Sequence, residues 1–236
     1  MDKAIWATWY DLPEEGKEEY IIWLHEVFIP RELERRKFLW TAHFENDASK
    51  KRASFSLRTS DQSIPNGSKY LLLFGAALPI AFLDPSPAKR RAMLTDEERK
   101  FLGRQIGVRS CIFVEYARVN GPEIARRGPG LTPGPVIQMG AFNINTWENE
   151  EELLLWYTEL RMPRMTRTSG CIGARNLVSI WGWAKHACLY EFVSLETSDK
   201  GIYRESKLSV RVVGNLIHAP GSSSRGKRIW PPVEDS

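Results

Sequence analysis

The chain has 236 residues, of which 42% are hydrophobic and 26% are charged. This composition is typical of a globular protein with enough residues for one large core or two small ones. No apolar run approaches the ~18–20 residues that span a bilayer, so we expect no membrane partner. The formal net charge of +4 comes from short basic clusters without a recognisable nucleic-acid-binding module, so we expect no nucleic-acid partner either.

The cysteines and the N-terminus indicate a cytoplasmic protein. The three cysteines, Cys111, Cys171 and Cys188, are an odd number without CxxC spacing, which argues against a disulfide framework or a zinc site. The first residues lack the apolar core of a secretion signal. We therefore expect reduced thiols and no metal.

The first half of the chain is predicted to follow the order strand, helix, strand, strand, helix, strand. Apolar alternation marks the strands, and a 3.6-residue period with acidic first turns marks the helices. Thr95 and Glu98 have the spacing of a capping box at the start of the second helical stretch. The expected elements are Lys3–Leu12, a helix ending near Pro30, 37–45, Lys69–Leu78, Pro87–Arg104 and Val108–Val119, with a polar insertion over 46–68.

The same order is predicted again in the second half. A Gly- and Pro-rich stretch separates the halves, so we divide the chain into a first unit (1–124), a linker (125–135), a second unit (136–220) and a C-terminal tail (221–236). The expected elements of the second unit are Val136–Ile144, Glu148–Thr166, Cys171–Trp183, His186–Leu195, Thr197–Leu208 and Val210–His218.

The two halves share a weak internal sequence repeat at an offset of 133 residues. Trp23 falls on Trp156, and Pro30 falls on Pro163. Such self-similarity favours a duplicated supersecondary unit, here the ferredoxin-like β-α-β-β-α-β arrangement. A four-stranded sheet with helices on one face must cover its other face. We therefore predict an α+β fold in which the two antiparallel sheets pack as an intramolecular eight-stranded barrel, so that a monomer is viable although further homo-oligomers stay open.

Short motifs in both halves carry a family resemblance. These are Trp156-Tyr157, Met162-Pro163 and the run Ser169–Arg175, together with Trp23, Ile29-Pro30 and the run Phe38–Trp40 in the first half. The chain resembles the dimeric α+β barrel superfamily, and within it the EthD-like and stress-responsive A/B barrel proteins, as a tandem duplication. It departs from the pattern at the histidine two positions before the proline, which is Phe28 in one half and Arg161 in the other.

The resemblance implies a ligand-binding site between the sheet and the helices of one unit. Relatives include polyketide cyclases, cofactor-free monooxygenases, muconolactone-type isomerases, haem-dependent branches and members without an assigned reaction. The ligand is expected to be a small hydrophobic or aromatic molecule. Because the fold does not settle the function, the chemistry depends on the side chains.

Candidate residues for proton transfer are few, because the chain has four histidines. His43 lies on the second predicted strand, where it is either a general acid or base or a buried structural histidine. His25 and Glu26 lie on the flank of the first helix, where solvent exposure is the simpler interpretation. Tyr10 and Arg161 are the expected acid and anion-binding partners, although Arg161 belongs to the other half. His186 follows a predicted turn and is expected to have a loop role, and His218 is predicted to be structural.

The aromatic content is high; core packing explains most of these residues, and a flat aromatic ligand would explain the surplus. The candidate ligand-binding residues are Trp9, Trp40, Phe28, Tyr157, Arg175, Trp181, Trp183 and Tyr190.

Three functions remain open from the sequence. The preferred one is a cofactor-independent enzyme that moves a proton next to a carbonyl group of a small aromatic or polyketide-type molecule, as a lyase, cyclase or isomerase does. The alternatives are a cofactor-free monooxygenase and a non-catalytic ligand-binding or stress-responsive protein. All three are expected to work without a cofactor.

Overall fold

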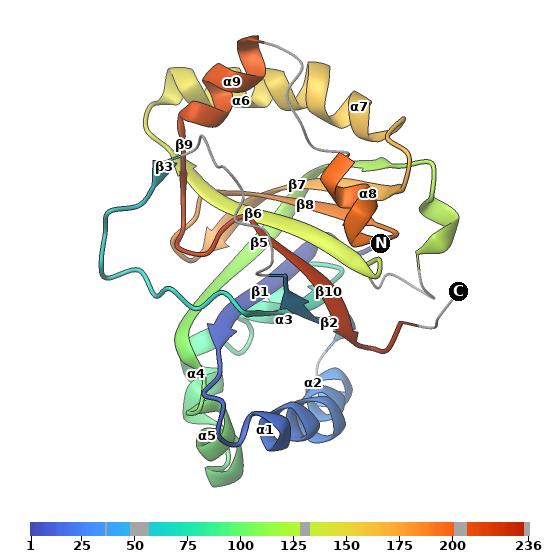
Figure 1. Ribbon diagram of the computed structural model, residues 1–236. Helices are drawn as coiled ribbons and strands as arrows, with labels where there is room; N and C mark the ends of the chain where they lie inside the picture. The colour runs from blue at the N-terminus through green and yellow to red at the C-terminus, as the bar shows by residue number, and fades with distance from the viewer. Residues whose placement is uncertain (36, 48–56, 128–132, 201–206, 234–236) are drawn as a thin grey trace.

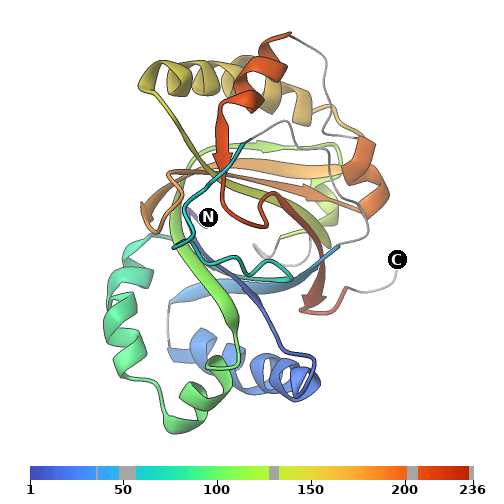
Figure 2. The ribbon, with the colours of Figure 1, turned by 60° about the vertical axis from the view of Figure 1, so that its left-hand side comes forward.

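A computed structural model describes residues 1–35, 37–47, 57–127, 133–200 and 207–233. It forms three layers, with a β-barrel between two groups of helices (Figures 1 and 2).

The first half contributes a four-stranded antiparallel sheet with the strand order β2-β4-β1-β5. This is the order of a ferredoxin-like unit. The strands are β1 (Ala4–Asp11), β2 (Phe38–Asn46), β4 (Tyr70–Ala76) and β5 (Ile106–Asn120). The helices are α1 (Lys17–Trp23), the π-helical segment η1 (Leu24–Phe28), α2 (Ile29–Arg35), α3 (Ile80–Leu83), α4 (Pro87–Ala92) and α5 (Asp96–Leu102).

The second half repeats this topology with the strand order β7-β8-β6-β10. Its strands are β6 (Val136–Ile144), β7 (Cys171–Trp181), β8 (His186–Phe192) and a fourth strand in two pieces, β9 (Leu216–His218) and β10 (Ser224–Trp230). A short 3₁₀ helix, η2 (Ile124–Arg126), joins the halves. The other helices are α6 (Trp147–Trp156), the π-helical segment η3 (Tyr157–Arg161), α7 (Met162–Met165), α8 (Leu195–Lys200) and α9 (Lys207–Gly214).

The two sheets close into one barrel because the fourth strand of each unit pairs with the second strand of the other. β5 pairs with β7, and β10 pairs with β2, both antiparallel. Alternate apolar side chains of β1, β2, β4, β5, β6 and β8, with Leu177 of β7, fill the interior; among them are Trp9, Phe44 and Phe113. Burial of this shared core is the main stabilising contribution. The predicted fold, an eight-stranded antiparallel α+β barrel formed within one chain, is confirmed.

Four element predictions need correction. The first helix, expected to end near Pro30, continues through this proline as α2 (Ile29–Arg35). The strand expected at Val210–His218 is mostly α9, because a valine-rich run reads as a strand although Val212 packs on the helical side of the second sheet. The strand that closes the barrel instead lies in the segment expected to be a tail. The helix expected over Pro87–Arg104 is two helices, α4 and α5. The capping box of Thr95 and Glu98, which begins α5, is confirmed.

The polar insertion 46–68 is described only in part, since 48–56 lie outside the described residues. Its later portion contains β3 (Leu57–Arg58), which pairs in parallel with β9.

The two π-helical segments are separated by the same number of residues as the internal sequence repeat. Leu24–Phe28 and Tyr157–Arg161 are 133 residues apart, and each is followed by a proline, Pro30 or Pro163. A proline cannot donate the helical hydrogen bond and its ring crowds the preceding turn, so a widened turn just before it relieves the clash. Single π turns are also frequent at functional sites.

Candidate functional site in the first half

The strongest candidate site lies between the first sheet and its helices. Along β2, the side chains of Trp40, Ala42 and Phe44 fill the barrel, so His43 points to the opposite face, toward α1 and η1. Tyr10 of β1 lies on this same helix-facing side, packed with Tyr20 of α1. The alternation of the two strands therefore brings the predicted tyrosine and histidine together.

Three of the predicted site residues form one hydrogen-bonded chain. The Tyr10 hydroxyl lies 2.8 Å from Nε2 of His43. Nδ1 of His43 lies 2.8 Å from Nε2 of His25. Both ring nitrogens of His43 are thus engaged, and His43 is fully buried. His25 reaches the sheet because it lies on the widened turn η1. Next to this chain, Gln105 donates a 2.7 Å hydrogen bond to the hydroxyl of Tyr20, whose ring packs on that of Tyr10.

Burial keeps both imidazoles neutral. It lowers the pKa of His25 to about 4. Burial, together with the neighbouring His25, also lowers the pKa of His43 well below its usual value. Burial raises the pKa of the Tyr10 hydroxyl, with a smaller contribution from Tyr20. At neutral pH the chain therefore holds two neutral imidazoles and a protonated tyrosine.

Two proton arrangements satisfy these hydrogen bonds. In one, the tyrosine donates to His43, His43 donates to His25, and Nδ1 of His25 carries a proton. In the other, His25 donates to His43, His43 donates to the tyrosine, and Nδ1 of His25 presents a lone pair. Conversion of the first arrangement into the second releases one proton at Nδ1 of His25, and it leaves no charge in the core only if the Tyr10 hydroxyl receives another proton in exchange. His25 is partly exposed, and no hydrogen bond to its Nδ1 is found among the described residues, so this nitrogen is the outward end of the relay.

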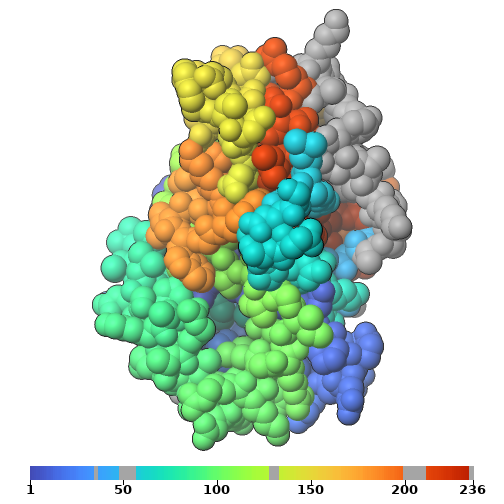
Figure 3. All heavy atoms as spheres, turned by 90° about the vertical axis from the view of Figure 1, so that its left-hand side faces the viewer, coloured from blue at the N-terminus to red at the C-terminus, as the bar shows by residue number. Residues whose placement is uncertain are grey.

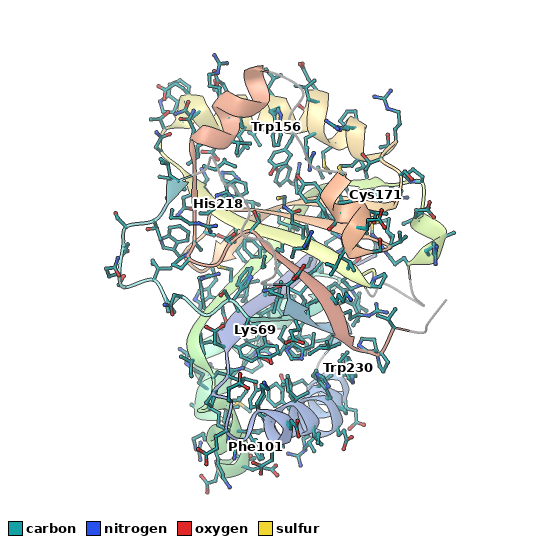
Figure 4. The ribbon with its side chains drawn as sticks, in the orientation of Figure 1. Lys69, Phe101, Trp156, Cys171, His218 and Trp230 are labelled. Atoms are coloured by element: carbon teal, nitrogen blue, oxygen red, sulfur yellow. The ribbon has the colours of Figure 1, made fainter. Side chains whose placement is uncertain are left out.

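Aromatic rings surround the relay. Tyr70 of β4 lies with its ring centroid 5.5 Å from that of His43. The ring centroid of Trp230, on β10, lies 6.2 Å from that of His25. Trp230 lies on the side of the barrel that faces α1 and α2 (Figure 4). The last residues of β10 thus complete a site that belongs to the first half.

The remaining predicted catalytic residues do not join this site. Glu26 is exposed on η1. Arg161 lies in the second half, on η3, where its Nε donates a 3.1 Å hydrogen bond to the Tyr190 hydroxyl. Burial and the Cys188 thiol raise the pKa of Tyr157 in this same group. Arg161, Tyr157 and Tyr190 therefore form a second buried cluster on the far side of the barrel.

The other predicted ligand-binding residues are dispersed. Trp9 and Trp40 lie inside the barrel, with Trp183 packed against that core, and Phe28 packs among the helices of the first half. Arg175 is fully buried and pairs with Asp2 at 2.5 Å, while Trp181 is 37% exposed. These positions do not surround the relay.

Sequence patterns missed three residues of the site. Tyr20 lies on the predicted apolar face of the first helix, where it is indistinguishable from a core residue. Tyr70 begins a strand whose residues are all apolar and buried, as in a core strand. Trp230 was assigned to the tail, and only the pairing of β10 with β2 places it beside His25.

No group of three or more histidine, cysteine, aspartate or glutamate side chains that could hold a metal ion occurs among the described residues. Within the same ranges, no helix is both long and apolar enough to cross a membrane.

Comparisons with solved structures place the chain among α+β barrel proteins. It is similar to an anthrone oxidase-like protein, with a TM-score of 0.63 and 10% identity over 97% of this chain and 91% of the other. It is also similar to a protein of Fusobacterium nucleatum provisionally assigned as a monooxygenase, with a TM-score of 0.58 and 7% identity over 96% and 92% of the two chains.

A third similar structure is provisionally assigned as a chlorite dismutase, with a TM-score of 0.54 and 10% identity over 97% and 96% of the two chains. At these identities the likeness establishes the fold. No family model and no curated sequence matches the chain.

Proposed function

We propose that the protein is a cofactor-independent enzyme that removes a proton from a small aromatic or polyketide-type molecule at the His25 end of the relay. The observation that supports this proposal most strongly is the chain His25–His43–Tyr10, in which each link measures 2.8 Å. A neutral imidazole whose second nitrogen is held by a hydrogen bond is the usual arrangement of a general base.

The proposed step begins with the bare Nδ1 of His25, which takes a proton from a carbon next to a carbonyl group. The C–H electron pair moves onto the carbonyl oxygen and gives an enolate, while His25 becomes an imidazolium. Its Nε2 proton then moves to Nδ1 of His43, while the Nε2 proton of His43 stays hydrogen-bonded to the neutral Tyr10 hydroxyl. The positive charge is thereby spread over the relay. Return of a proton to another carbon completes an isomerase, cyclase or lyase reaction.

The site also fits a flat, apolar substrate. Trp230 and Tyr70 provide aromatic surface next to the two histidines, and Ile229 packs with them on the helix-facing side. Such walls bind rings by dispersion and exclude water, which favours an enolate that is paired with an imidazolium.

A cofactor-free monooxygenase is the second candidate, because it shares the first step. The carbanion formed by proton removal reacts with dioxygen in place of a proton. Two of the similar structures bear oxygenase or oxidase names, one of them anthrone oxidase-like. These names support a small-molecule enzyme without choosing between the two outcomes. A ligand-binding protein without turnover is the third candidate.

The test is hydrogen exchange into candidate substrates in D₂O. Anthrone, aromatic β-diketones and hydroxylated aromatic ketones are incubated with the protein in air and under argon, and deuterium incorporation and products are followed by NMR and mass spectrometry. The proton-transfer proposal expects exchange under both atmospheres. Oxygenated product in air alone, with exchange under argon, assigns the monooxygenase. Saturable binding without exchange in any compound would contradict both enzyme proposals and favour the ligand-binding protein.

A further inference from the structure

Arg109 is a buried arginine with an unpaired edge. It lies on β5 opposite Trp9 of β1 and is 4% exposed. Its Nη1 donates to the carbonyl oxygens of Pro65 and Pro220, at 2.9 and 3.0 Å. Its Nε and Nη2 are buried and have no hydrogen-bond partner.

The unpaired edge has a defined chemical preference. Nε and Nη2 are the two parallel donors with which a guanidinium binds one carboxylate or phosphate group in a bidentate manner. The Nη1 contacts fix the orientation of the guanidinium from the opposite side. The Trp9 ring centroid lies 4.9 Å from the guanidinium carbon and supports its plane.

The surroundings add positive charge and no negative charge. Across the ranges that the structure describes, no carboxylate forms an ion pair with Arg109 or with Arg58. Burial lowers the pKa of Arg109 to about 10; the nearby Cys111 thiol acts against this shift, and Arg58 adds to it. Arg58 also lowers the pKa of His218, its neighbour across the β3–β9 pair.

An uncompensated cation is costly to bury, and a second cation nearby increases the cost. Most other buried arginines among the described residues are paired with acids, for example Arg175 with Asp2 and Arg225 with Asp47. The contrast indicates that the counter-charge of Arg109 comes from outside the chain.

Several distant segments meet at this point. The loop that contains Pro65 and the turn between β9 and β10 both contact Arg109 of β5. Figure 3 shows the stretch from Leu57 to Lys69 (cyan) lying across the join between the two halves, next to the chain around β9. The place is separate from the His25–His43–Tyr10 relay, because Arg109 and Trp9 belong to the barrel side of the sheet and the relay belongs to the helix side.

We propose that Arg109, with Arg58 beside it, forms a binding site for a small oxyanion at the end of the barrel. The ligand presents two oxygens on one centre, as the carboxylate of an organic acid or a phosphate does. The inference is independent of the proposed enzymatic activity.

The test measures thermal unfolding and isothermal titration of the full chain with acetate and, separately, inorganic phosphate. Ionic strength is held constant with sodium chloride. The variants are Arg109→Lys, which keeps the charge and removes the bidentate edge, and Arg58→Gln on the exposed neighbour. Arg31→Gln is the matched control, because it removes the same charge from a surface arginine paired with Glu97.

The proposal expects a saturable rise of Tm with at least one of the two anions. Binding should weaken about tenfold or more in Arg109→Lys. It should weaken by a smaller factor, about three- to fivefold, in Arg58→Gln as a second cation is removed. Arg31→Gln should bind as the wild type does. Tighter binding of acetate identifies the ligand group as a carboxylate, and tighter binding of phosphate identifies it as a phosphate. Equal binding supports a site that accepts either group.

Three results would contradict the proposed oxyanion site. The first is an absence of saturable binding by both anions in the wild-type protein. The second is unchanged binding in Arg109→Lys. The third is equal weakening in Arg58→Gln and Arg31→Gln, which would reveal a general charge effect. If Arg109→Lys does not fold, the comparison of Arg58→Gln with Arg31→Gln decides the outcome.

Discussion

The relay predicts a graded loss of activity along its length. His25→Gln removes the base itself and should lower kcat/KM by about 10²–10⁴-fold, the usual contribution of a positioned general base. His43→Ala leaves the base in place but removes the hydrogen bond that orients it and stabilises its charged form. Tyr10→Phe removes only the last, neutral link.

The two smaller magnitudes follow from the kind of bond lost. A hydrogen bond to a charged group contributes about 1.5–3 kcal/mol, and each 1.4 kcal/mol changes a rate tenfold. If the bond between His25 and His43 strengthens to this extent when His25 is protonated, His43→Ala should lower kcat/KM by about 10- to 150-fold. A neutral hydrogen bond contributes about 0.5–1.5 kcal/mol, so Tyr10→Phe should cost about 2- to 13-fold.

The assay is the rate of deuterium exchange into the best substrate of the panel, with circular dichroism on each variant to show that the fold is intact. His186→Gln is the matched control, since His186 lies in the second half beside Glu150 at 2.9 Å. Its exchange rate should equal that of the wild type. A fully active His43→Ala enzyme, or a Tyr10→Phe enzyme that loses more activity than His25→Gln, would refute the relay.

The remaining predictions concern pH, packing and assembly. Because burial lowers the pKa of His218 to about 4, the unfolded chain binds more protons than the folded chain between about pH 6.5 and 4. Stability should therefore fall by about 2 kcal/mol from pH 7 to pH 5 in urea titrations, and His218→Gln should flatten that slope. Burial also lowers the pKa of His25 to about 4, but this partly exposed histidine should contribute less to the loss because solvent screens it. For the same reason the acid limb of kcat/KM should lie near pH 4 and not near 6.5. Gly75→Ala should lower Tm, with a cost of about 1–3 kcal/mol, because its Cβ would lie within 2.0–2.4 Å of the Trp40 indole; an unchanged Tm would contradict this packing. Light scattering should find a 27.1 kDa monomer, and separately expressed halves should be insoluble or recombine on mixing, whereas two stable half-length monomers would argue against a shared core.

The overall topology could be predicted because it rests on short-range patterns. Alternation and helical period identify most elements of both halves, and the need to cover one apolar face of each sheet predicts the barrel. The end of the chain could not be assigned in this way. The segment SRGKRIW of β10 is short and basic, and it becomes a strand because it fits between β2 and β6. Tertiary pairing overrides local composition there.

The site could be predicted only in part, for a similar reason. His43 and Tyr10 were identified because each lies on a strand with a definite inward or outward face. The contribution of His25 depends on the π-helical turn, which rotates the helix relative to a regular 3.6-residue wheel and brings an expected surface residue to within 2.8 Å of His43. Aromatic content misled the assignment of ligand-binding residues, since Trp9 and Trp40 fill the barrel. The sequence does not show whether a large hydrophobic side chain packs inside the barrel or between the sheet and the helices.

The two halves share a backbone arrangement but differ in chemistry at matching positions. At the offset of 133 residues, His25 corresponds to Thr158, His43 to Asn176 and Phe28 to Arg161. Asn176 is 1% exposed, and neither of its amide atoms has a hydrogen-bond partner. The Thr158 hydroxyl donates to backbone carbonyls of its own helix, so it does not reach the sheet as His25 does.

A relay therefore forms in the first half and is absent from the corresponding position of the second. The second half instead carries the Arg161–Tyr190 pair on its π-helical turn. Its fourth strand also completes the first site, because β10 brings Trp230 beside His25. In this arrangement one half holds the proton-transfer groups, while the other closes the barrel and supplies a wall of the site. Activity should consequently depend on the whole chain, even though every group that moves a proton lies within the first 43 residues.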